Sequence, residues 1–190
     1  MISHVYVNPI YVSLASKLLR KTSVKVCSTI GFPYGASMPA VKGFEAKRAV
    51  EDGASELDMV MNLSAFKSRD YTLVKNDIKT VLEVKRLYSK KIIVKVIIET
   101  AFLTSEEIVM ACKLCKETGA DFVKTSTGLF GKGTTVEDVR LMRKTVGRSM
   151  GVKAAGGIRT YKDALAMIKA GANRIGTSTA AAIIREAPYG

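Results

Sequence analysis

Short apolar runs alternate with amphipathic stretches along the whole chain. This alternation predicts repeated strand–helix units. The clearest strand covers residues 92–99, where apolar residues are nearly continuous, as expected for a strand buried on both faces. Seven strands are expected in all, at residues 3–7, 24–30, 57–62, 92–99, 122–126, 152–155 and 173–177.

The helices between these strands carry clear start and stop signals. Asn8 with Pro9 is expected to start the first helix, and Thr135 with Asp138 caps the helix after the fifth strand. Three helices end at a glycine that is followed by a polar turn and the next strand. The spacing of these glycines gives about 26 to 33 residues per strand–helix unit, which is typical of repeated βα units. The sheet should therefore be parallel.

Two architectures fit a parallel sheet of this kind, an open doubly wound sheet and a closed barrel. A TIM (β/α)8 barrel has eight strands and typically about 250 residues. This chain has 190 residues and seven expected βα units. Its length suits one domain over residues 1–190, with a substantial core.

The composition is that of an ordinary folded protein. Hydrophobic residues make up 47% and charged residues 25%, which argues against disorder. No apolar run approaches the roughly 18 residues that span a bilayer, and the first residues do not resemble a signal peptide. We therefore expect a cytoplasmic protein without membrane contact.

A formal net charge of +13 requires an explanation. Nucleic acid, an anionic substrate and lysine-rich helix faces would each account for it. The basic residues are scattered and no aromatic-interleaved motif is present, so specific nucleic-acid binding is not expected. A phosphorylated substrate would be attracted by the same field.

Cysteine and histidine do not suggest a metal site. Cys112 and Cys115 lie three apart within an expected helix, on its apolar face, which favours core packing over metal or redox chemistry. His4 is the single histidine of the chain. We expect neither a metal nor a cofactor.

Lys124 is the most informative candidate for chemistry, because it lies in the short strand 122–126 just before a polar loop. Burying an ammonium group is costly and lowers its pKa. A neutral amine near pH 7 is a nucleophile that forms a Schiff base with a carbonyl. The alternative is a strand-end lysine whose amine reaches solvent.

Two further charged strand residues strengthen the first interpretation. Lys153 lies one strand after Lys124, and two inward-facing lysines would favour a neutral amine on one of them. Asp58 lies in the third strand and supplies a carboxylate. We expect these three side chains to converge.

Two turns near the end of the chain suit an anion. Gly156 and Gly157 precede Arg159 and a helix start, so backbone N–H groups, a helix N-terminus and a cation come together. A second small-residue turn at residues 176–179 opens the last helix. Paired phosphate-binding loops after the last two strands recur in barrels.

At these residues the chain resembles the deoxyribose-phosphate aldolase family, which are class I aldolases on a TIM barrel. The matching segments are residues 5–9, 24–35, 56–62, 95–100, 121–128 and 151–160. The resemblance implies reversible cleavage of 2-deoxy-D-ribose 5-phosphate to D-glyceraldehyde 3-phosphate and acetaldehyde. It also implies that Lys124 forms the Schiff base, with Asp58 and Lys153 in the proton relay. The phosphate would be held by Gly128, Gly156, Gly157, Arg159 and Ser178.

The chain departs from the family at its beginning. Family members carry an earlier strand, with a Leu-Ile-Asp-His-like motif, and a helix before the segment that matches residues 5–9. We therefore expect a barrel that lacks its first βα unit, with exposed strand edges that favour a homo-oligomer, a dimer or a tetramer. The alternatives are a catalytically impaired barrel fragment that binds a phosphate ligand, and another Schiff-base aldolase such as a transaldolase.

Overall fold

The structure is a computed structural model that describes residues 2–88, 91–131 and 133–188. The expected domain bounds, residues 1 and 190, lie outside the described residues. The chain divides into two compact units, which we describe separately. The N-terminal unit comprises residues 2–96 and 117–121, and the C-terminal unit comprises residues 97–116 and 122–188.

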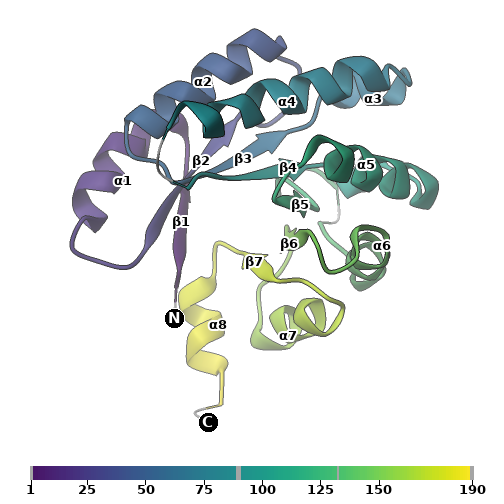
Figure 1. Cartoon of the computed structure of the whole chain (residues 1–190). Helices are drawn as coiled ribbons and strands as arrows, with labels where there is room; N and C mark the ends of the chain where they lie inside the picture. The colour runs from purple at the N-terminus through teal and green to yellow at the C-terminus, as the bar shows by residue number, and fades with distance from the viewer. Residues whose placement is uncertain (1, 89–90, 132, 189–190) are drawn as a thin grey trace. The chain divides into compact units, whose positions relative to one another are not determined.

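The N-terminal unit contains a parallel sheet whose strands follow chain order (Figure 1). Strand β1 pairs in register with β2, and β2 pairs with β3. Strand β4 continues the order, and the Ile93 N–H group donates to the Ser55 carbonyl at 3.1 Å. The strands are β1 (His4–Val7), β2 (Lys25–Ile30), β3 (Glu56–Val60) and β4 (Ile93–Ile97), of which Ile97 belongs to the C-terminal unit.

The helices of this unit follow the strands as expected, with two differences from the sequence analysis. They are η1 (Pro9–Tyr11), α1 (Val12–Leu19), α2 (Pro39–Glu51), α3 (Leu63–Lys67) and α4 (Tyr71–Leu87). The Asn8 side chain does not cap a helix but accepts a 3.5 Å hydrogen bond from Thr29. Helix α3 was not predicted; it begins because Asn62, expected in the strand, accepts the Ala65 N–H group at 3.0 Å.

Helices α2 and α4 lie side by side, above strands β2 and β3 in the view of Figure 1. A fully buried ion pair joins them, with Lys42 Nζ 2.6 Å from Asp77 Oδ2. Burial lowers the pKa of Lys42 and raises the pKa of Asp77. Lys42 also donates to the Val60 carbonyl, and Asp77 accepts from the Asn62 N–H group. The pair therefore supports the end of strand β3.

The C-terminal unit shows the same alternation of strands and helices. Its elements are η2 (Thr100–Phe102), α5 (Ser105–Thr118), β5 (Phe122–Lys124), α6 (Val136–Val146), β6 (Gly151–Ala155), α7 (Tyr161–Lys169), β7 (Arg174–Gly176) and α8 (Ala180–Glu186), the last two residues of α5 belonging to the other unit. Strands β5, β6 and β7 are parallel and lie in chain order. A capping box starts α6 at Thr135, as predicted, and another starts α7 at Thr160.

The described residues therefore contain seven parallel strands that alternate with helices, which confirms the predicted α/β class. No helix in the described part of the chain has both the length and the apolar character needed to cross a bilayer.

Candidate active site

Two buried lysines lie on neighbouring strands of the C-terminal unit. Lys124 is the last residue of β5 and Lys153 is the middle residue of β6, and the parallel register places them directly opposite each other. Opposite residues of a parallel pair point to the same face of the sheet. The exposed fractions are only 2% for Lys124 and 8% for Lys153. The predicted juxtaposition of these two lysines is confirmed.

The residue after Lys124 fixes this geometry. The Thr125 N–H group donates to the Lys153 carbonyl at 3.1 Å. The Thr125 hydroxyl donates to the Ala155 carbonyl and accepts from the Ala155 N–H group, both at 3.0 Å. Because Thr125 is fully buried, these bonds hold the ends of β5 and β6 together without competition from water.

The glycines predicted to hold phosphate lie close together beyond these strand ends. Gly128 and Gly156 have φ angles of +90° and +93°, which disfavour any side chain. A Cβ atom on Gly156 would lie 3.4 Å from the Gly128 Cα atom and 3.3 Å from the Gly133 Cα atom. Gly157 follows, with a φ angle of +79°. The chain thus forms a narrow backbone crossing that side chains would fill.

Arg159 and Ser178 lie in the loops after β6 and β7, and hydrogen bonds join the two loops. The Thr177 hydroxyl donates to the Ile158 carbonyl at 2.7 Å, and the Thr179 hydroxyl donates to the Arg159 carbonyl at 3.1 Å. The side chains of Arg159 and Ser178 are exposed. These loops are therefore neighbours, and both candidates are accessible to a ligand.

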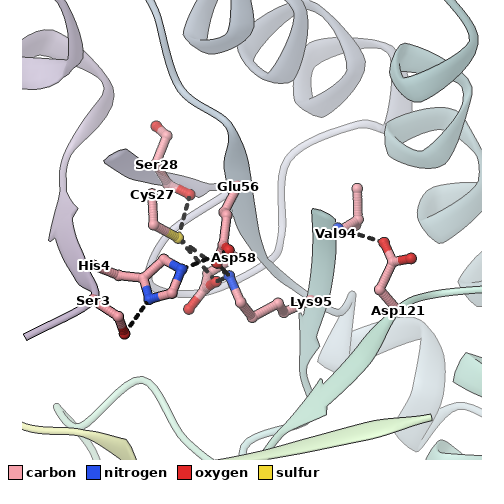
Figure 2. A network of polar contacts seen from close by, with 9 residues as sticks. All are labelled: Ser3, His4, Cys27, Ser28, Glu56, Asp58, Val94, Lys95 and Asp121. Atoms are coloured by element: carbon pink, nitrogen blue, oxygen red, sulfur yellow. Dashed lines mark hydrogen bonds and ion pairs between the residues drawn. The ribbon is translucent and has the colours of Figure 1, made fainter. Parts of the chain in front are cut away.

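Asp58, the third predicted catalytic residue, belongs to the N-terminal unit, where its side chain is fully buried in β3. Its Oδ1 atom lies 2.7 Å from Lys95 Nζ and accepts from the Cys27 thiol at 3.0 Å (Figure 2). Lys124 and Lys153 belong to the C-terminal unit. The convergence of Asp58 with the two lysines stays a prediction.

Sequence reasoning missed the network around Asp58. Lys95 Nζ also lies 2.6 Å from Glu56 Oε2, and Glu56 Oε1 lies 2.8 Å from His4 Nε2 (Figure 2). Burial alone would lower the pKa of Lys95, but attraction to Asp58, Cys27 and Glu56 outweighs it and raises that pKa above its usual 10.5. The signal was present in the sequence, because Glu56 and Asp58 lie two apart in one strand and Lys95 interrupts an apolar strand.

The cysteines of α5 behave as core residues. Burial raises the pKa of Cys112 to about 12 and raises that of Cys115 as well. Both are therefore thiols rather than thiolates at neutral pH. The described residues contain no group of three or more His, Cys, Asp or Glu side chains that could hold a metal ion.

Comparison with known proteins identifies a family and relatives of this chain. The sequence model of the DeoC/LacD family aldolases matches residues 3–185. A deoxyribose-phosphate aldolase of Thermococcus kodakarensis is 63% identical over 97% of this chain and 82% of that protein. One from a Thermoanaerobacter species is 56% identical over 96% of this chain and 81% of that protein.

Solved structures show the same fold. A structure described as QR15, an aldolase, has a TM-score of 0.92 and 48% identity, covering 97% of this chain and 81% of that one. A tetrameric deoxyribose-phosphate aldolase of Aeropyrum pernix has a TM-score of 0.86 and 36% identity, covering 95% of this chain and 75% of that one. The fold is the TIM-barrel type of these aldolases, represented here by seven strands in the described residues. With its family match, its relatives and its paired buried lysines, the chain belongs to the DeoC/LacD family of aldolases.

Proposed function

We propose that this protein is a deoxyribose-phosphate aldolase that reversibly cleaves 2-deoxy-D-ribose 5-phosphate to D-glyceraldehyde 3-phosphate and acetaldehyde. The observation that carries the proposal is the pair of buried lysines, Lys124 and Lys153, in register on neighbouring parallel strands. Relatives of 56–63% identity bear this name, and a buried amine is the group that class I aldolase chemistry needs.

In the proposed reaction, Lys124 Nζ adds to the aldehyde carbon C1 of the open-chain sugar and water leaves, forming an iminium ion. The 3-hydroxyl then loses its proton and the C2–C3 bond breaks, releasing glyceraldehyde 3-phosphate. The bonding electrons move into the iminium and leave an enamine. Protonation of C2 and hydrolysis then release acetaldehyde and restore the lysine.

Two further residues serve proton transfer in this proposal. Asp58 moves the protons at the 3-hydroxyl and at the enamine carbon, which suits its carboxylate. Lys153 favours the neutral form of Lys124, because two ammonium groups on one buried face repel each other. The support for Lys153 is its register with Lys124 and its burial.

The phosphate group is proposed to bind Gly128, Gly156, Gly157, Arg159 and Ser178. The close approach of Gly128 and Gly156 exposes backbone at a place where a Cβ atom would intrude. Arg159 adds a cation next to the start of α7, where the helix dipole favours an anion. Ser178 adds a hydroxyl from the neighbouring loop.

Reductive trapping tests this proposal directly. Borohydride with acetaldehyde should attach a two-carbon group to Lys124, identified by peptide mass spectrometry. Lys124→Met should remove this adduct and lower kcat by at least about a thousandfold. The exposed Lys162→Met is the matched control and should react like the parent protein.

The outcomes separate the alternatives. No adduct on Lys124 contradicts the proposal, and phosphate binding without cleavage would favour the impaired scaffold. Cleavage of fructose 6-phosphate in preference to deoxyribose 5-phosphate would favour a transaldolase.

We also propose a homo-oligomer, a dimer or a tetramer, and a cytoplasmic location. The Aeropyrum pernix relative is tetrameric. Helix α1 and the turn before it expose Ile10, Tyr11, Leu14 and Leu18 in an apolar stripe that suits an interface. The three cysteines are buried and form no disulfide, which suits a reducing compartment. Sedimentation analysis tests the assembly, and a monomer at micromolar concentration would contradict it.

A further inference from the structure

Glu99 stands out among the described residues of the C-terminal unit. It follows strand β4, and its side chain is fully buried. Its backbone is left-handed, with φ 53° and ψ 70°. The other described non-glycine residue with positive φ is Arg69, which is exposed in a turn. Burying an acidic side chain and holding its backbone in a left-handed conformation both lower the stability of the fold. Such strained residues are found mostly at functional sites.

The Glu99 carboxylate is directed at the loop that contains Gly128. Its Oε2 atom accepts the Thr127 N–H group at 2.9 Å and the Thr127 hydroxyl at 2.5 Å. The Oε1 atom is buried and has no hydrogen-bond partner among the described residues. Hydrogen bonds to a carboxylate are stronger than those between neutral groups. Thr127 is therefore held by both its backbone and its side chain.

The left-handed turn is what makes this arrangement possible. Immediately after Glu99, the Thr100 N–H group donates to the Thr125 carbonyl at 2.9 Å, and just before it Ile98 N–H donates to the Lys124 carbonyl at 3.0 Å. The backbone on both sides of Glu99 thus follows β5, while the side chain reaches Thr127 beyond the strand end. The loop 125–128 is fixed from β6 by Ala155 and from β4 by Glu99.

We propose that Glu99 is a positioning residue that determines the preference for a phosphorylated substrate. It holds Thr127, and thereby sets the direction of the backbone at Gly128, which lies against Gly156. This inference rests on the proposed function, in which these glycines hold the phosphate. Glu99 itself acts through Thr127.

The test compares substrates with and without the phosphate. Glu99→Met removes both acceptors, so the ratio of kcat/KM for 2-deoxyribose 5-phosphate to kcat/KM for 2-deoxyribose should fall by about tenfold or more. Glu99→Gln keeps an oxygen that can accept from Thr127 and should retain the ratio within about threefold. Trapping of acetaldehyde on Lys124 should persist in both variants.

A double-variant cycle tests whether the effect passes through Thr127. Thr127→Val removes the hydroxyl donor, and Thr127→Ser keeps it. The quantity compared is the ratio of kcat/KM for the phosphorylated sugar to kcat/KM for the free sugar. If Glu99 acts through Thr127, the fold decrease of this ratio in the double variant Glu99→Met, Thr127→Val should be smaller than the product of the two single fold decreases. A double-variant decrease equal to the product of the two single decreases would contradict the action of Glu99 through Thr127. Near-ultraviolet circular dichroism checks that each variant is folded.

A binding measurement keeps this inference separate from the proposed activity. Calorimetric titration with inorganic phosphate should show weaker binding to Glu99→Met than to the parent protein and Glu99→Gln. An inactive parent protein whose phosphate binding still depends on Glu99 would refute the activity and support the positioning role. Equal losses of kcat/KM on both sugars, with phosphate binding unchanged, would reduce Glu99 to a structural role and overturn the proposal.

Discussion

At the residue scale, Lys95 neutralises two buried carboxylates in the N-terminal unit. Its ammonium lies within 2.7 Å of two carboxylates, Glu56 and Asp58, and all three side chains are at least 97% buried. Separating one partner from such a group leaves an uncompensated buried charge. Lys95 is therefore the cation that allows two acidic side chains to remain inside this sheet.

Replacing this cation should destabilise the protein strongly. We expect Lys95→Met to lower the free energy of unfolding by about 3–5 kcal/mol. Lys75→Met is the matched control, because Lys75 pairs with Glu117 at 3.9 Å with both side chains exposed, and it should cost less than about 1 kcal/mol. Urea denaturation measures both, and equal effects would contradict the assignment.

The stabilisation that Lys95 provides should depend on pH in a defined way. The pKa of Lys95 is raised above its unfolded value near 10.5. Its stabilisation is therefore fully present below that pH and is lost as pH rises through the folded pKa. The difference in unfolding free energy between the parent protein and Lys95→Met should stay constant up to about pH 10 and shrink above it.

At the element scale, the loops after β5 and β6 meet through backbone rather than side chains. A Cβ atom on Gly133 would lie 2.6 Å from the Gly156 carbonyl oxygen. The Thr134 N–H group also donates to this carbonyl at 3.1 Å. The path of the loop 133–134 therefore controls the position of Gly156, a proposed phosphate ligand.

Gly133→Ala should weaken phosphate binding as well as stability. Gly119→Ala is the matched control, because Gly119 has nearly the same positive φ, +85° against +80°, and a Cβ atom there meets nothing within 4 Å. Both changes should cost about 1–2 kcal/mol from the left-handed backbone. Only Gly133→Ala should also raise KM for the phosphorylated sugar. An equal KM in both variants would contradict the role of this crossing.

At the scale of the whole molecule, the formal charge of +13 bears on how an anionic substrate arrives. Scattered positive charge raises the local concentration of anions, and salt screens it, with a Debye length of about 10 Å at 0.1 M. The charge therefore acts on the association rate rather than on the chemistry of Lys124.

We expect a salt dependence that distinguishes the two sugars. Between about 0.02 and 0.5 M sodium chloride, kcat/KM for 2-deoxyribose 5-phosphate should fall several-fold, whereas the value for 2-deoxyribose should change less than about twofold. Steady-state kinetics across this range measures both. If kcat/KM for the two sugars fell equally, the salt effect would belong to the fold and not to electrostatic attraction of the phosphorylated sugar.

The sequence by itself determined what depends on local backbone preference and periodicity. All seven expected strands differ from the observed ones by no more than two residues at either end, and the cap at Thr135 lies where predicted. The positions of Lys124 and Lys153 at equivalent places in successive strands were also readable, because parallel strands align by chain order.

Only the tertiary structure decided the contacts that join distant segments. The pairing of Lys42 with Asp77, 35 residues apart, left no pattern in the chain, because each looks like an ordinary charged helix residue. Glu99 was visible as a charge in a strand, but its left-handed backbone and its bonds to Thr127 depend on where β4 and β5 end. Side-chain chemistry and period are local properties, whereas burial, register and close approach arise when separate elements pack together.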